Sequence, residues 1–95
     1  MRERFIERKF VEAVKKKGGF APKFVSPGLD GMPDRIVLFP IGKIAFVELK
    51  APGETMRPLQ VRRQRKLEEL GFSVYCVDDV SQIDGVIKEI GGDAQ

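Results

Sequence analysis

Three segments of the chain have the period of an amphipathic helix, namely residues 3–17, 58–70 and 81–90. In the first segment the apolar residues recur at helical spacing, at Ile6, Phe10, Ala13 and Val14. Gly18 and Gly71 are placed to end the first two helices, and Pro58 suits the first position of the second. Ser81 with Asp84 resembles a capping box. We therefore expect one helix near each end of the chain and one in its second half.

Between the helices, short apolar runs predict strands at residues 35–39, 43–50 and 73–77, with a further short strand at about residues 23–26. Pro40-Ile41-Gly42 joins the runs 35–39 and 43–50 in the manner of a hairpin. Within these strands, residues 36–39 and 44–47 are apolar on both faces, so helices are expected on both sides of the sheet. No repeat or linker interrupts the pattern. We expect one α/β domain over residues 1–95, with a mixed sheet flanked by helices.

The hairpin brings charged residues together. A three-residue loop pairs Phe39 with Lys43 and, counted outward, Asp34 with Glu48; a two-residue loop would shift this pairing by one residue. Either way the two carboxylates are neighbours, since directly opposed residues have Cβ atoms about 5 Å apart. Lys50 shares the face of Glu48, about 7 Å along the strand. Like charges this close destabilise a sheet, so the pattern indicates a divalent cation between them or, in part, neutralisation by Lys50.

A plainer interpretation makes Asp34, Glu48 and Lys50 ordinary surface residues at a fraying sheet edge, as a lone Glu-x-Lys usually is. The segment that precedes the hairpin favours a site instead. Gly31 and Pro33 shape a tight turn that aims Asp34 inward, and the hairpin delivers Glu48 and Lys50 to the same place.

Two polar residues on the helices are further candidates. Gln60 lies about 20° from Leu67 around the second helix, so it faces the core and needs partners there. Glu7 borders the apolar stripe of the first helix, one turn before Phe10. Each has an equally plausible structural role: Gln60 as a partner of backbone groups in the first turn, and Glu7 as a solvated partner of nearby arginines.

Composition excludes several kinds of chemistry. The chain has no histidine, which rules out a histidine base, a Ser-His triad and a zinc site with histidine ligands. The single Cys76 cannot form an internal disulfide, and its strand setting predicts a small buried residue. No Walker-type loop or Gly-rich dinucleotide motif is present, so no nucleotide cofactor is expected. Catalysis would depend on carboxylates, lysine and a hard metal ion bound by oxygen.

Charge and hydropathy bear on partners and location. Seventeen Lys and Arg against fourteen Asp and Glu give a net charge of +3, a mild preference for polyanions such as nucleic acid. Lys23, Arg57 and Arg63 flank the carboxylates and are candidate DNA phosphate contacts, with plain surface solubility as the alternative. No apolar stretch approaches the roughly 20 residues of a membrane span, so a cytoplasmic protein is expected.

The order of these residues resembles a known nuclease family. Gly31-x-Pro33-Asp34, then Glu48-x-Lys50 in the run Glu48–Gly53, then Gln60 on the next helix, is similar to the VRR-NUC (virus-type replication-repair nuclease) family. That family belongs to the PD-(D/E)XK nuclease superfamily. The resemblance extends over nearly the whole chain, and its length is similar to the stand-alone, phage- or bacterially encoded members, which would act in the host cytosol.

The resemblance implies a restriction-endonuclease-like αβββαβα core and hydrolysis of DNA phosphodiester bonds with Mg²⁺ or Mn²⁺. Carried over by position, Asp34, Glu48 and the backbone carbonyl of Leu49 would bind the metal. Lys50 would orient or activate the attacking water, and Gln60 would hold the water or the phosphate. Glu7 would be a further acidic ligand, although Glu3, one turn away on the same face, could replace it.

For stand-alone members the resemblance also implies homodimers that cut branched DNA such as Holliday junctions. A two-fold dimer would match the pseudo-symmetry of a four-way junction, and its apolar contact could include Phe5, Phe20 or Phe24. Two other functions stay open at this point. One is a non-catalytic nucleic-acid-binding module of the same fold, although Asp34, Glu48 and Lys50 are all present. The other is a nuclease that acts on flaps, ends or linear duplex.

Overall fold

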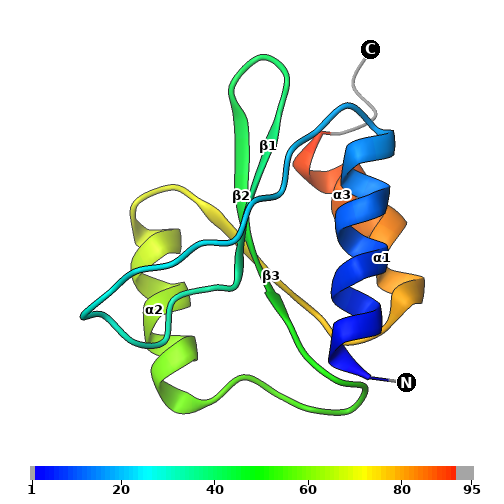
Figure 1. The fold of residues 1–95 in the computed structure, drawn as a ribbon. Coiled ribbons are helices and arrows are strands. Elements are labelled where there is room, and N and C mark those ends of the chain that lie inside the picture. The colour runs from blue at the N-terminus through cyan, green and yellow to red at the C-terminus, as the bar shows by residue number, and fades with distance from the viewer. Residues whose placement is uncertain (1, 92–95) are drawn as a thin grey trace.

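The computed structural model describes residues 2–91 of the chain. Its elements, in order, are α1 (Glu3–Lys16), β1 (Arg35–Phe39), β2 (Lys43–Leu49), α2 (Pro58–Glu69), β3 (Ser73–Val77), a short 3₁₀ helix η1 (Val80–Gln82) and α3 (Ile83–Ile90). The sheet lies in the middle, with α2 on one side and α1 and α3 on the other (Figure 1). The expected mixed sheet with helices on both sides is confirmed.

The sheet has the strand order β1-β2-β3. β1 pairs antiparallel with β2 through the hairpin, and β2 pairs parallel with β3. Phe39 lies opposite Lys43 and Arg35 opposite Val47, so the register is the one predicted for a three-residue loop. Continued by one residue, this register sets Asp34 against Glu48 at the end of the sheet away from the hairpin tip.

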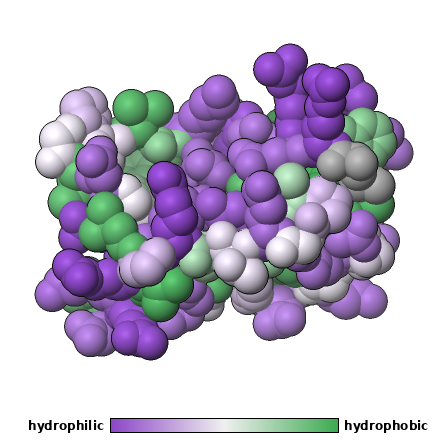
Figure 2. Space-filling view, turned by 90° about the horizontal axis from the view of Figure 1, so that it is seen from below, coloured by the Kyte–Doolittle hydropathy of each residue, from purple (hydrophilic) through white to green (hydrophobic). Residues whose placement is uncertain are grey.

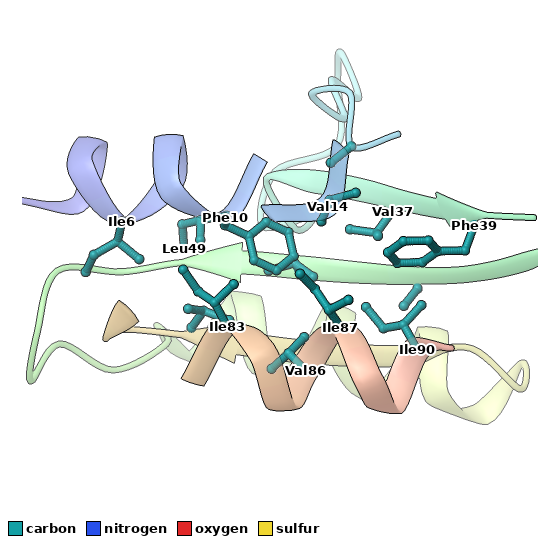
Figure 3. Close-up of a cluster of buried hydrophobic side chains, with 14 residues drawn as sticks. Ile6, Phe10, Val14, Val37, Phe39, Leu49, Ile83, Val86, Ile87 and Ile90 are labelled. Carbon is teal, nitrogen blue, oxygen red and sulfur yellow. The ribbon is translucent and has the colours of Figure 1, made fainter. Parts of the chain in front are cut away.

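Alternate residues of the strands supply two separate cores. The larger one lies between the sheet and the helices α1 and α3, where Leu49 of β2 meets apolar residues of both helices (Figure 3). The smaller one lies on the α2 side and centres on Phe46, Leu67 and Val74. Because Glu48 has the parity of Phe46, its side chain points to the α2 face. One helix covers this face, whereas two cover the other, and the polar site lies on this face.

The short strand expected at residues 23–26 does not form. Instead, residues 20–24, which we call the edge segment, lie along the open edge of β1 and pair with it at two isolated bridges, Phe20 with Leu38 and Lys23 with Arg35. Pro22 between them has no backbone N–H to donate, which prevents a continuous ladder. The element order is therefore αβββαβα with its first strand reduced to an edge segment.

Two smaller predictions were wrong. The last helix is preceded by η1, whose capping box is formed by Asp79 and Gln82 rather than by Ser81 and Asp84. Gln82 lies closer than Asp84 to the turn after β3, and its amide oxygen accepts from the backbone N–H of Asp78, at 2.9 Å. Cys76 is exposed rather than buried, because no helix covers its position on the outer strand β3.

Within residues 2–91, no helix is both long enough and apolar enough to cross a membrane.

Candidate active site

Asp34 is held from both sides at the start of β1. Its carboxylate oxygen Oδ2 accepts from the backbone N–H of Leu49 at 2.9 Å. Its own backbone carbonyl accepts from the N–H of Phe24 at 2.8 Å, which ties it to the edge segment. The side chain is half-buried. These two bonds fix the Asp34 carboxylate beside the end of β2.

The turn before Asp34 requires its glycine. Gly31 has φ +87°, and a Cβ added there would lie 2.8 Å from Cγ of Leu59 on α2. Arg63, one turn further along α2, donates from Nε to the carbonyl of Asp30 at 2.8 Å. Pro33 is buried. The residues before Asp34 are therefore packed directly on the N-terminal half of α2, which explains the Gly-x-Pro-Asp pattern.

Gly31→Ala is expected to lower both stability and cleavage. The new methyl group must displace Leu59 in addition to straining the backbone, so the free energy of unfolding should fall by about 2 kcal/mol or more. Gly28→Ala is the matched control, since Gly28 has φ +82° with no atom within 4 Å of an added Cβ. Chemical denaturation of both variants separates the two contributions, and equal losses would show that the contact with Leu59 has no energetic weight.

Glu48 is a buried carboxylate whose two oxygens have different surroundings. The residue is 2% exposed. Oε2 accepts from Nε2 of Gln60, at 2.5 Å, and lies 3.3 Å from Nζ of Lys50. Oε1 is buried and has no hydrogen-bond partner among the described residues. An unpartnered carboxylate oxygen next to Asp34 is costly by itself and is suited to a cation bound by oxygen ligands.

The electrostatics of this pair follow from burial. Burial raises the pKa of the Glu48 carboxyl above its usual range, and the negative charge of Asp34 raises it further. The hydrogen bond and the charge of Lys50 act in the opposite direction. The protein alone therefore leaves the two carboxylates under-neutralised, and one lysine does not compensate both.

Gln60 faces the core as predicted, and it connects α2 to the site. Its exposed fraction is 6%, and it is the third residue of the helix. Its Oε1 accepts from the backbone N–H of Arg57 at 2.8 Å, so its Nε2 is the atom directed at Glu48. The start of α2 thus sets the orientation of the amide.

The acidic residues of α1 divide between two environments. Oε2 of Glu7 accepts from Nε of Arg35 at 3.0 Å, so this carboxylate is already paired. The carboxylate of Glu3 instead interacts with the charges of the site: burial raises its pKa, the Asp34 charge raises it further, and Lys50 lowers it. No cluster of three or more His, Cys, Asp or Glu side chains suited to a metal occurs in residues 2–91.

The basic candidates lie around the site without touching the carboxylates. Lys23 is exposed on the edge segment opposite Arg35. Arg57 is exposed at the N-cap of α2, and with Asp30 and Gln60 it lines a hollow of about 400 Å³. Arg63 holds the Asp30 carbonyl and therefore has a structural role in addition to any contact with DNA.

Arg35 is the residue of this region that sequence reasoning missed. It binds Glu7 through Nε and the carbonyl of Ala21 through Nη1, at 2.9 Å, and so links α1 to the edge segment. Strand parity could have indicated it, because Arg35 directly follows Asp34 and must point to the opposite, α1-covered face. A charge on that face needs an acidic partner, and Glu7 is the one at hand.

The site lies at the end of the sheet where the N-terminus and the loop at residues 51–57 emerge. The surface at this end is mostly hydrophilic, with smaller apolar patches (Figure 2). Two opposed carboxylates, a lysine and a glutamine at one end of a mixed sheet are suited to hydrolysis of a phosphodiester with the help of a hard cation. Fold and site together define a nuclease of the α/β class.

Comparison with known proteins agrees with this class. A solved structure described as "VRR_NUC domain" superposes with a TM-score of 0.85, at 30% identity, over 90% of this chain and 94% of that one. "Putative nuclease p44" of Acyrthosiphon pisum secondary endosymbiont phage 1 is 52% identical over 85 residues, which is 87% of this chain and 91% of the phage protein. No family model matches the chain. The chain belongs to the VRR-NUC family of nucleases.

Proposed function

We propose that this protein is an endonuclease that hydrolyses DNA phosphodiester bonds with Mg²⁺ or Mn²⁺. The observation that carries the proposal is the buried Glu48, whose Oε1 has no partner in the described residues and which lies beside Asp34. So unfavourable a pair has a physical explanation if a divalent cation binds between the two carboxylates.

Asp34, Glu48 and the backbone carbonyl of Leu49 would hold the cation. When bound, it would neutralise the scissile phosphate and lower the pKa of the attacking water. Of the two acidic candidates on α1, Glu3 and Glu7, the charge interaction of Glu3 with both Asp34 and Glu48 supports Glu3 as the outer acidic residue. Glu7 is the weaker choice for this role, because taking part would break its bond to Arg35.

The remaining residues of the site would position Glu48, stabilise the transition state and contact the DNA. Lys50 favours the ionised form of Glu48, and its ammonium would stabilise negative charge in the transition state. Gln60 fixes one oxygen of Glu48, so that the other is free to bind the cation. Lys23, Arg57 and Arg63 would contact DNA phosphates around the site.

We further propose a homodimer that cuts branched DNA, Holliday junctions among it. The chain has a radius of gyration of 12.6 Å and one Asp34–Glu48 pair, so one copy reaches only one strand near a branch point. A two-fold dimer would present two such sites to opposed strands. Phe24 does not suit the dimer contact, because its ring packs against Phe46 in the α2-side core, with centroids 5.6 Å apart. Phe5 and Phe20 remain exposed.

A panel of labelled four-way junction, flap, nicked and linear DNA tests this function. We expect cleavage only with Mg²⁺ or Mn²⁺, fastest on the junction, with cuts in paired opposed strands and a dimer by light scattering. Cleavage in excess chelator would refute the dependence on metal. If the protein is a monomer and cleaves flaps or ends fastest, the proposal of junction cleavage is wrong and the protein is a nuclease of flaps or ends. Binding without cleavage under every condition would indicate the non-catalytic module.

A further inference from the structure

A groove runs along the outer side of α1, away from the carboxylates. Its first part, about 430 Å³, lies between α1 and the edge segment and is lined by Arg4, Arg8 and Lys23, with Arg35 at its base. Its second part, about 350 Å³, continues past Arg35 and Val11, which line both parts, towards Phe20. From Arg4 to Lys15 the helix rises about 16 Å, enough for a few nucleotides.

The charge of the first part is positive and largely uncompensated. Its two acidic residues are already used, Glu7 by Arg35 at 3.0 Å and Glu12 by Lys9 at 4.0 Å. Within residues 2–91, Arg4 and Lys23 form no ion pair with an acidic side chain, and both are exposed. An anionic chain with regularly spaced charges is the complementary ligand.

The second part of the groove is lined mainly by apolar residues, with Lys15 and Arg35 beside them, and it ends at the aromatic ring of Phe20. Phe20 is 64% exposed, next to Ala21 and Pro22, which also line this part. Its backbone exchanges hydrogen bonds of 2.9 Å and 2.8 Å with Leu38. Gly19 before it packs so tightly that an added Cβ would lie 2.5 Å from the ring of Phe39. The exposed ring is thus held on a fixed backbone, ready to stack on a planar partner.

Arg35 keeps the two walls of the groove in register. Its guanidinium bonds to Glu7 on α1 and to the carbonyl of Ala21 on the edge segment. The groove begins at the same end of the sheet as the carboxylates, although on the other face, because Arg4 directly follows Glu3, whose pKa is raised by burial and by the charge of Asp34.

We propose that this groove binds an unpaired segment of the DNA strand next to the scissile phosphate. Arg4, Arg8 and Lys23 contact its phosphates, and Phe20 stacks on one of its bases. Basic grooves with exposed aromatic rings bind single strands in this way, because every base has a flat face to stack. A duplex, whose bases are already stacked, would gain nothing from Phe20. The inference rests on the proposed function and deepens it: the branched substrate, a four-way junction included, would offer this groove a strand that is unpaired at the branch point.

Binding of fluorescently labelled single-stranded and blunt duplex oligonucleotides, measured by anisotropy in chelator, tests the groove without cleavage. Phe20→Ala should weaken single-strand binding about tenfold and leave duplex binding unchanged, while Phe20→Tyr should restore it. Leu70→Ala is the matched control, since Leu70 is 63% exposed on the far side of the sheet, after α2. Arg4→Ser should reduce the slope of the logarithm of the single-strand binding constant against the logarithm of salt concentration by about 0.7, the value for one lost phosphate contact. Lys88→Ser on α3 should leave this slope unchanged.

Three results would overturn the inference. In the first, Phe20→Ala binds single strands as tightly as Leu70→Ala does. In the second, Phe20→Ala loses as much affinity for duplex as for single strands. In the third, the wild type is a dimer and Phe20→Ala is a monomer, which would assign Phe20 to the dimer contact. The proposed function fails separately, through wild-type protein that cleaves no DNA with any metal. If such a protein still binds single strands through Phe20, the groove inference stands without the nuclease.

Discussion

Asp34→Asn is expected to abolish DNA cleavage, with a loss of at least a thousandfold, or about 4 kcal/mol of barrier. Asparagine keeps an oxygen that can accept from the N–H of Leu49, so the start of β1 should not move. What it removes is one of the two negative charges that we assign to the cation. A single-turnover assay with saturating enzyme measures the loss in the chemical step itself. Retention of a tenth or more of the wild-type rate would exclude Asp34 from the metal site.

The same substitution should stabilise the protein when no metal is present. Asp34 raises the pKa of Glu48, so in the wild type the folded state binds more protons than the unfolded state just above the ordinary glutamate pKa. Stability due to this group is therefore present at low pH and falls as pH rises through the raised pKa of Glu48. With Asp34→Asn that fall should be smaller.

Urea denaturation in chelator, at pH 5 and pH 7, measures this difference. The stability advantage of Asp34→Asn over the wild type should be larger at pH 7. Asp84→Asn on the exposed start of α3 is the control, and it should change neither cleavage nor the pH dependence. An Asp34→Asn variant that is less stable than the wild type at both pH values would mean that the two carboxylates do not repel each other.

Lys50→Met is expected to reduce the cleavage rate by a hundredfold or more while changing DNA affinity less than threefold. Methionine preserves most of the aliphatic stem but removes the charge that lies 3.3 Å from Glu48. It should also destabilise the protein without metal, because Glu48 then loses the cation that lowers its pKa. Lys88→Met on α3 removes a charge far from the sheet end and should leave rate and affinity unchanged. An affinity loss with an unchanged rate constant would assign Lys50 to binding.

The hairpin was the most predictable part of the molecule. Pro40 and Gly42 define the loop, and the sequence leaves two registers for the strands on either side, of which the structure has the one for a three-residue loop. Both registers bring Asp34 beside Glu48, so this pair could be predicted from the sequence. Gln60 could be derived as well, because the helical period sets it on the same face as Leu67.

The part played by α1 could not be derived in the same way. Glu3 and Glu7 share one helix face, and the sequence does not fix how the helix tilts over the sheet end. The contact with Arg35 distinguishes the two, since its guanidinium binds the carboxylate of Glu7 and leaves Glu3 as the acidic residue without this partner. That contact joins residues 28 positions apart, so the sequence did not predict it. The edge segment was mispredicted for a local reason, because the missing N–H of Pro22 outweighs the strand-like residues after it.

Divalent-cation binding to the wild type and to Asp34→Asn, followed by thermal unfolding across a Mn²⁺ titration, tests the central claim most directly. We predict that the wild type begins less stable and rises with a saturable dependence on Mn²⁺, as expected for a ligand that binds only the folded state. Asp34→Asn should begin more stable and respond little. An equal response of both proteins, or none in the wild type, would contradict a cation held between Asp34 and Glu48.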